Sequence, residues 1–206
     1  DKNGNITFDC DLPVGFKWYV KEIAVNEHYI LSNAKYEFST EYQGQDIKTI
    51  EINLNDGKPI ENKLIYGSVK GLKLDRETEK PVEGALFGLF RNDETEFTEE
   101  NAILTAVSDK DGVFSFDNVP FGEWCIRELK PAEGYLPNTE IYTVQINSSA
   151  QLIELTVVND KIPEIHTTAS VDGKKKTAKS GEITITDTVS YKHLVPGTEY
   201  ILKGVL

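Results

Sequence analysis

The feature that most restricts the fold of this chain is an internal repeat. Residues 1–22 read DKNGNITFDCDLPVGFKWYVKE and residues 109–128 read DKDGVFSFDNVPFGEWCIRE. A glycine turn, an alternating segment, a Pro-x-Gly step, a tryptophan and a glutamate follow in the same order in both. Farther along, Asn62 matches Asn159. A repeated unit of this kind indicates tandem modules built on one fold.

The repeat also predicts where the modules begin and end. The second copy is preceded by GSVKGLKLDRETEKPVEGALFGLF at residues 67–90, which has no counterpart before the first copy. Residues 1–66 are therefore expected to be the C-terminal part of one module, and residues 67–161 a complete one. The pattern changes at Pro163, so residues 162–206 are expected to open a third, different module. The first residue is Asp1 and not Met, and we expect a piece of a longer protein.

Apolar and polar residues alternate along most of the chain, and helical periodicity is nearly absent. Asn-Gly, Asp-Gly and Pro-Gly pairs stand between the alternating segments and are typical of tight turns. Short strands separated by regular turns predict an all-β fold of sandwich modules. The segments expected to be strands include residues 113–116, 124–128, 141–146, 152–158 and 183–191.

Composition excludes several classes of function. The net charge of −12 disfavours nucleic acid and anionic membrane surfaces, which attract basic proteins. No apolar run approaches the roughly 20 residues that span a bilayer. The two cysteines, Cys10 and Cys125, are too few for a disulfide framework and are expected to be free thiols that pack as small hydrophobic side chains. The three histidines have no metal-ligand spacing, and no nucleotide-binding motif occurs, so neither a metal nor a cofactor is expected.

Two acidic residues occupy positions that alternation assigns to the core. Glu128 shares a strand face with Trp124 and Ile126, and Glu22 stands in the same relation to Trp18. A carboxylate on a core face is costly unless it is neutral or partnered. Either these residues lie at strand ends in solvent, or they belong to a functional site. Their occurrence in both copies keeps the second interpretation open.

The ordered motifs resemble the Cna B-type, SpaA-like pilin domain of Gram-positive surface proteins. The resemblance covers residues 67–161 and the shorter copy at 1–66. It implies a transthyretin-like or Ig-like β-sandwich with a spontaneous isopeptide bond. The residues that carry it are Gly67, Ser68, Val69, Lys73, Asp75, Gly84, Ala85, Phe87, Leu89, Phe90, Asp109, Gly112, Phe114, Phe116, Pro120, Gly122, Trp124, Glu128, Pro131, Gly134, Tyr135, Val158 and Asn159.

By this resemblance, the bond joins Lys73 to Asn159 with the help of Glu128. Burial lowers the pKa of a lysine and raises that of a glutamate, which suits a neutral nucleophile and a proton donor. Gly71 interrupts the apolar pattern of the first strand, so a register shift that turns Lys70 inward stays open. In the shorter copy, Glu22 and Asn62 are the corresponding acid and amide.

Residues 162–206 resemble the start of the surface domains that form Thr–Gln ester bonds, the VaFE-type repeats. The resemblance rests on IHTTA at residues 165–169, on the strand at 183–191, and on PGTEY at 196–200. It implies Thr167 as the ester nucleophile and Asp187 as an assisting acid, with the glutamine beyond Leu206. Thr167 as an ordinary strand residue remains the alternative, because threonine favours strands.

These features favour a structural stalk or pilin-like region of a bacterial cell-surface protein, and not a conventional enzyme. Its expected location is extracellular, anchored to the cell wall through other regions, with neighbouring modules of the same chain as partners. The alternative is an adhesin module that binds host matrix or glycan. A glycosidase with a glutamate acid needs a second carboxylate at a defined distance, which the sequence does not place.

Overall fold

The computed structural model describes all of the chain except residues 1–2, 5, 9, 48–49, 172–183 and 204–206. The chain divides into two compact units, Asp1–Ile65 and Tyr66–Leu206. Within the described residues, regular structure consists of strands and one short 3-10 helix, η1 (Leu54–Gly57). The all-β fold class expected from the alternation is confirmed.

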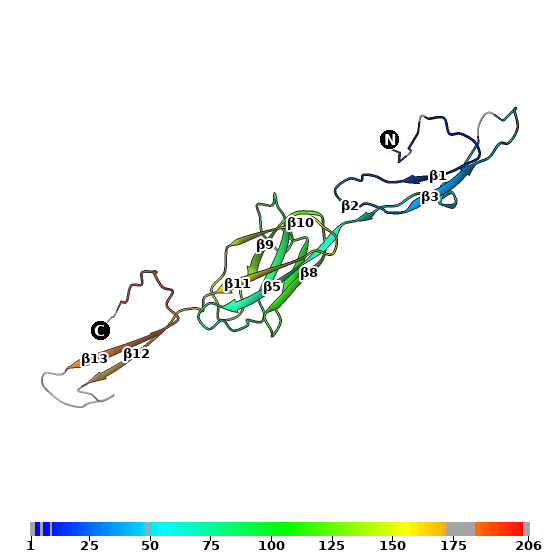
Figure 1. Cartoon of the computed structure of the whole chain (residues 1–206). Helices are drawn as coiled ribbons and strands as arrows, with labels where there is room; N and C mark the ends of the chain where they lie inside the picture. Colours follow the sequence, from blue (N-terminus) through cyan, green and yellow to red (C-terminus); the bar gives the residue numbers. More distant parts are fainter. Residues whose placement is uncertain (1–2, 5, 9, 48–49, 172–183, 204–206) are drawn as a thin grey trace. The chain divides into compact units, whose positions relative to one another are not determined.

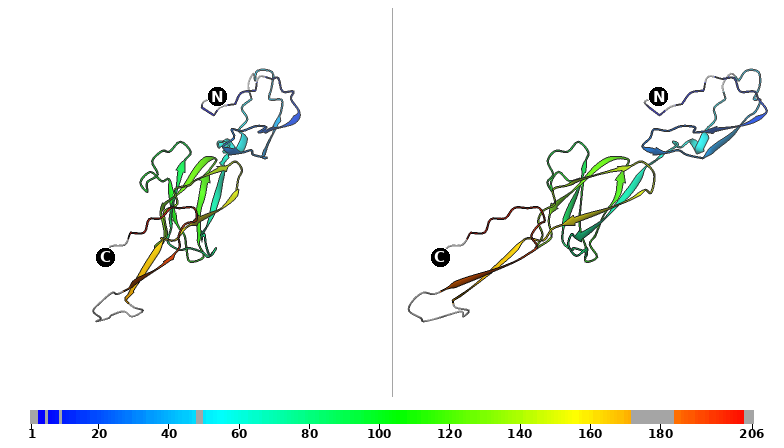
Figure 2. Two further views of the ribbon diagram at one scale, coloured as in Figure 1. Left: turned by 90° about the vertical axis from the view of Figure 1, so that its left-hand side faces the viewer. Right: turned by 60° about the vertical axis from the view of Figure 1, so that its left-hand side comes forward.

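The second unit contains two sheets that face each other as layers (Figures 1 and 2). One sheet has the strand order β10-β9-β6-β7 and the other has the order β11-β5-β8. All pairings are antiparallel except that of β11 with β5, which run parallel. The strands are β5 (Tyr66–Asp75), β6 (Leu86–Arg91), β7 (Leu104–Val107), β8 (Val113–Pro120), β9 (Gly122–Lys130), β10 (Ile141–Ile146) and β11 (Leu152–Asn159).

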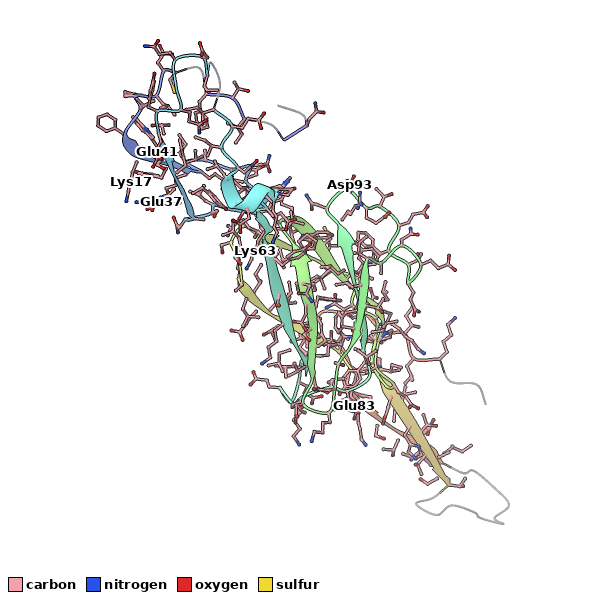
Figure 3. The ribbon with its side chains drawn as sticks, turned by 90° about the vertical axis from the view of Figure 1, so that its right-hand side faces the viewer. Lys17, Glu37, Glu41, Lys63, Glu83 and Asp93 are labelled. Carbon is pink, nitrogen blue, oxygen red and sulfur yellow. The ribbon has the colours of Figure 1, made fainter. Side chains whose placement is uncertain are left out.

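Apolar side chains from both sheets meet in the core between them. Phe87 of β6 stacks on Phe114 of β8, with ring centroids 3.8 Å apart and planes 8° apart. The core includes Val69, Leu89, Phe116, Val119, Ile126, Ile146 and Val157. Side chains fill the space between the layers, and Glu83 and Asp93, which flank β6, lie at opposite ends of the sandwich (Figure 3). Aromatic packing of this kind contributes much of the burial that stabilises a small sandwich.

The first unit repeats part of this arrangement. Strand β1 (Phe16–Lys21) pairs with β3 (Lys35–Thr40), and β2 (Tyr29–Ile30) pairs with β4 (Lys63–Leu64). Val20 lies opposite Tyr36 in the β1–β3 pair, as Ile126 lies opposite Tyr142 in the β9–β10 pair. The register of the repeated strands is therefore the same in both units. Both cysteines are free thiols, and Cys125 is buried as expected, whereas Cys10 is exposed, which differs from the packed position expected for it.

Residues beyond the sandwich form an antiparallel pair of strands, β12 (Glu164–Val171) and β13 (Ile185–Lys192). The strand expected at residues 183–191 thus overlaps β13, although Ile183 itself lies outside the described residues. Most side chains of the two strands are exposed. Two strands alone cannot bury a face, which requires a third strand or a second layer.

Candidate functional site

Strand β5 places its two lysines on opposite faces. Val69, Gly71, Lys73 and Asp75 are buried, whereas Lys70 between them is exposed. Lys73 has no exposed surface. Beyond the irregularity at the start of the strand, the pairing of β5 with β8 continues without a shift past Gly71. Of the two lysines, Lys73 is therefore the one that faces the space between the sheets.

The aromatic ring of Phe114 explains why residue 71 is a glycine. Gly71 is the register partner of Phe114, and a Cβ atom at this position would stand 2.0 Å from the ring atom Cζ of Phe114. The aromatic ring occupies the space that an inward side chain of β5 would fill. The glycine thus makes room for the stacked ring, and the alternation that buries Lys73 is kept.

Burial changes the chemistry of Lys73. Loss of solvent lowers the pKa of Lys73 from 10.5 to about 8, an effect that the negative charge of Glu128 partly opposes. The Nζ atom donates a hydrogen bond of 3.3 Å to the carbonyl oxygen of Leu74. With a pKa near 8, roughly a tenth of the amine is uncharged at pH 7. The uncharged amine is the form that can attack a carbonyl carbon.

Strand β9 carries Glu128 into the same interior. Ile126 and Glu128 are buried at 0% and 6% exposure, as the alternation from Trp124 requires. The backbone N–H of Asn138 donates to Oε2 of Glu128 at 2.8 Å. Glu128 is therefore a buried, partnered carboxyl group and not a strand-end residue in solvent.

Strand β11 brings Asn159 beside Lys73 through its parallel pairing with β5. Val157 lies opposite Lys73, and Asn159 follows two residues later, opposite Asp75. Residues two apart on a strand share a face, so Asn159 lies diagonally across from Lys73 on the buried side. Asn159 is 2% exposed. Three strands from two sheets thus bring together Lys73, Glu128 and Asn159.

The side-chain amide of Asn159 is held by its nitrogen. Nδ2 donates to both carboxylate oxygens of Glu128, at 2.8 and 2.9 Å, and to the carbonyl oxygen of Leu136 at 2.9 Å. A backbone carbonyl only accepts hydrogen bonds, so Leu136 determines which end of the amide is the nitrogen. Oδ1 is buried and has no hydrogen-bond partner in the described part of the chain. The amide nitrogen of Asn159 therefore faces the carboxyl group of Glu128.

The first unit contains the matching acid and amide. Nδ2 of Asn62 donates to Oε1 of Glu22 at 2.7 Å, and the backbone N–H of Ser32 donates to Oε2 at 3.1 Å. Glu22 and Asn62 are both half-buried. Oδ1 of Asn62, like that of Asn159, is a buried atom without a partner among the described residues. The repeat therefore extends from the sequence to the geometry of the site.

Thr167 and Asp187 lie near each other on the β12–β13 pair. Thr167 is opposite Val189, and Ala169 is opposite Asp187. Directly opposed residues and residues two apart share a face, so Thr167 and Asp187 are diagonal neighbours on one face. Both side chains are exposed, which differs from the inward position expected for Asp187. The reason is that two strands cannot enclose a core.

The sequence reasoning assigned no role to Asp75, which is the centre of a buried polar cluster. Asp75 accepts hydrogen bonds from Tyr135 at 2.9 Å and from the backbone N–H groups of Glu77 and Thr78, and it pairs with Lys161 at 3.0 Å. Burial by itself raises the pKa of Asp75, but these partners together hold it well below its usual range. The cluster ties the end of β5 to the chain just beyond Asn159. The spacing of Lys73 and Asp75, which are separated by one residue, was the sequence feature that could have pointed to Asp75.

Within the described residues, no group of three or more His, Cys, Asp or Glu side chains could hold a metal ion. The same residues include no helix that is long and apolar enough to cross a membrane.

Family models match two parts of the chain. Residues 67–161 match the SpaA prealbumin-like fold domain, and residues 163–206 match the T-Q ester bond containing domain. The resemblances noted for residues 67–161 and for residues 162–206 are thereby confirmed.

The individual proteins that resemble this chain share less than 30% sequence identity with it. The trypsin-resistant surface T6 protein of Streptococcus pyogenes serotype M6 is 28% identical over 124 residues, which are 60% of this chain and 21% of that protein. The Bacillus anthracis TIE protein has a TM-score of 0.59 at 18% identity, over 89% of this chain and 37% of that one, and shares the fold. The major pilin subunit of Bacillus cereus has a TM-score of 0.40 at 26% identity, over 52% and 32%. The chain thus spans about a fifth of the curated relative.

Proposed function

Because residues 67–161 form a SpaA prealbumin-like domain and residues 163–206 match a T-Q ester bond domain, we propose that this chain is a load-bearing part of a bacterial surface stalk. Its modules are closed by covalent bonds between their own side chains. The observation that carries this proposal is the meeting of a buried lysine, glutamate and asparagine in one sandwich.

The reaction joins Lys73 to Asn159 and releases ammonia. The uncharged Nζ of Lys73 attacks Cγ of Asn159, and a C–N bond forms. Glu128 takes a proton from the attacking nitrogen and gives one to Nδ2, which leaves as ammonia when its bond to Cγ breaks. The contacts of Nδ2 with both oxygens of Glu128 support this proton transfer. Strand pairing supplies the proximity. The reaction occurs once in each molecule, so the chain is not a turnover enzyme.

The positions of the bonded strands support a mechanical role. Strand β5 opens the module and β11 closes it, and the two are parallel neighbours. Force on a tandem chain enters at the first strand and leaves at the last. Hydrogen bonds between strands contribute only about 0.5–1.5 kcal/mol each, so a sheared sheet yields. An amide between Lys73 and Asn159 carries the load past the sheet.

The intact mass of the purified chain tests the bond. The expected mass is that of the sequence less one ammonia, and tandem mass spectrometry should place the branch at Lys73 and Asn159. Glu128→Gln should give the full sequence mass. Lys70→Ala is the matched control, because Lys70 is exposed on the opposite face of β5 and should leave the loss of ammonia intact. A full sequence mass for the unaltered chain contradicts the proposal.

Single-molecule pulling tests the mechanical role. The 67–161 module, held between reference domains, should show no unfolding step, whereas its Lys73→Ala variant should release most of the module's length. A full step from the unaltered module contradicts the role even if the bond is present.

The neighbouring region supports a second crosslink of the same purpose. We propose Thr167 as the ester nucleophile and Asp187 as its assisting acid, and their diagonal positions on one face of the β12–β13 pair support this. The T6 relative is a surface protein by name, and this supports a location outside the cell, with anchoring to the wall through other regions. The partners proposed are the modules that precede and follow in the same chain.

A further inference from the structure

A turn that follows β9 holds the carboxyl group of Glu128 in one orientation. The backbone N–H of Asn138 donates to Oε2 of Glu128 at 2.8 Å. The side chain of Asn138 in turn accepts a hydrogen bond of 2.7 Å at Oδ1 from the backbone N–H of Glu140. A side chain that accepts from the backbone two residues on fixes an Asx turn. The turn therefore sets the direction of the N–H that contacts the acid.

The same side chain reaches the strand that carries the amide. Nδ2 of Asn138 donates to the carbonyl oxygen of Val158 at 3.1 Å and to the hydroxyl of Tyr142 at 3.2 Å. Val158 immediately precedes Asn159. One residue thus contacts Glu128 through its backbone and the backbone beside Asn159 through its amide.

The first unit contains an independent copy of this turn. Ser32 donates its backbone N–H to Oε2 of Glu22 at 3.1 Å, and its hydroxyl accepts from the N–H of Ala34 at 3.2 Å. Ser32 follows Glu22 by the same ten residues that separate Asn138 from Glu128. Serine and asparagine are different side chains that form the same kind of turn. The shared feature is the N–H directed at the acid.

We propose that Asn138 is a positioning residue for the Lys73–Asn159 bond, with Ser32 as its counterpart in the first unit; the inference rests on the proposed crosslink. The N–H of Asn138 at Oε2 fixes the plane of the carboxyl group, and Oε1, which accepts no hydrogen bond from Asn138, stays directed at the amide of Asn159. Nδ2 of Asn159, the nitrogen that must gain a proton to leave, lies 2.8 Å from Oε1 and 2.9 Å from Oε2. The turn thus directs the acid toward the leaving group. Asn138 touches no reacting atom with its side chain and acts through Glu128.

The test measures the rate of bond formation in the full chain. Chains made by cell-free synthesis are quenched in acid denaturant at intervals, and intact mass gives the fraction that has lost ammonia. Asn138→Ala removes the turn acceptor and should slow the reaction about tenfold or more, since a misplacement of about 1 Å can cost roughly a hundredfold in rate. Asn138→Ser restores the turn found in the first unit and should recover most of the rate.

A structural contribution is separated from the positioning role in a chain that cannot crosslink. Asn138→Ala and Asn138→Ser are each combined with Lys73→Ala, and their unfolding midpoints are compared. Similar midpoints together with different rates support positioning. Equal rates for the unaltered chain and Asn138→Ala overturn the positioning role of Asn138 but not the crosslink. An Asn138→Ser variant as slow as Asn138→Ala has the same meaning. If the unaltered chain never loses ammonia, the crosslink itself fails.

Discussion

The two copies of the repeat hold the same acid–amide pair in two different environments. In the first unit, Glu22 and Asn62 are joined by a hydrogen bond of 2.7 Å and are half-buried. In the second unit, Glu128 and Asn159 are joined by a hydrogen bond of 2.8 Å, and both are buried. Among the described residues, only the second pair lies beside a buried lysine, Lys73 of β5.

In both units, the backbone three residues after the asparagine makes a matching hydrogen bond. The N–H of Ile65 donates to the carbonyl of His28 at 2.8 Å, and that of Ile162 donates to the carbonyl of Gly134 at 2.9 Å. The pairing of acid with amide therefore does not require the lysine strand. Strand β5 adds the amine of Lys73 and buries it. Burial lowers the pKa of a lysine, and the uncharged amine is the form that can attack a carbonyl carbon.

The largest expected effect comes from removing the amine of the second unit. Lys73→Met keeps most of the side-chain volume but cannot form the bond. A crosslink that closes a loop of about 86 residues is worth roughly 4–5 kcal/mol by chain entropy. A loss of this size lowers the Tm of a domain this small by about 15 °C or more. Calorimetry of the full chain should show this drop.

Two variants serve as controls for that comparison. Lys70→Met should leave the Tm within a degree or two, because Lys70 is exposed and on the opposite face. Asn62→Ala should leave the number of lost ammonia molecules unchanged, because the described residues of the first unit include no buried lysine. A Lys73→Met variant as heat-stable as the unaltered chain argues against the crosslink.

Supplying a lysine strand to the first unit should make the two units alike. A copy of residues 66–75, joined ahead of Asp1 by a flexible linker, offers Glu22 and Asn62 the strand that β5 provides to the second site. The extended chain should lose two ammonia molecules, and the second loss should disappear with Asn62→Ala. Intact mass reads the result directly.

The control for this graft is the same extension with alanine in place of its copy of Lys73. It should lose only one ammonia molecule. A second loss that persists in that control, or that Asn62→Ala fails to remove, shows that Glu22 and Asn62 are not equivalent to the second site.

The stability of the unlinked second unit should rise with pH, whereas that of the linked unit should not. In Asn159→Ala, Lys73 stays a free amine whose folded pKa is near 8, below its unfolded value of 10.5. Between these values the unfolded chain binds more protons, so the free energy of unfolding increases with pH, by about 2 kcal/mol from pH 8 to 10. Urea denaturation across this range measures it.

The upper limit of that range is set by two tyrosines. Burial is the main cause that raises the pKa of Tyr135 and Tyr142 to about 12. Each contributes stability that is lost as the pH rises beyond the ordinary tyrosine value near 10. The double variant Lys73→Met with Asn159→Ala should show no rise in the free energy of unfolding from pH 8 to 10. A slope that survives in it assigns the effect to another group.

The smallest effect concerns the space that admits Phe114. Gly71→Ala places a Cβ 2.0 Å from the ring and forces a shift of the stacked pair, at a cost of about 1–3 kcal/mol. Phe114→Leu in the same chain should recover part of this loss. Urea midpoints compare the variants, with exposed Lys70→Ala expected within about 0.5 kcal/mol of the parent. A neutral Gly71→Ala contradicts the packing described for this strand.

Several features of the site followed from the order of residues alone. The repeat matched Glu22 with Glu128 and Asn62 with Asn159, and period-2 alternation placed Glu128 on the same strand face as Ile126, which the structure shows to be buried. These inferences succeed because the strand period of two is a local property, and because a repeated fold repeats its register. The choice between Lys70 and Lys73 was different, since a glycine weakens the pattern on which the register depends.

Tertiary structure decided the features that depend on distant or backbone atoms. The ring of Phe114 lies over Gly71 and keeps Lys73 inward, the carbonyl of Leu136 turns the amide of Asn159, and the N–H of Asn138 directs Glu128. Every residue except proline has such an N–H and every residue has a carbonyl, so their positions leave no signature in a sequence. The sequence by itself determined which side chains could react, and only the folded chain determined which of their atoms face one another.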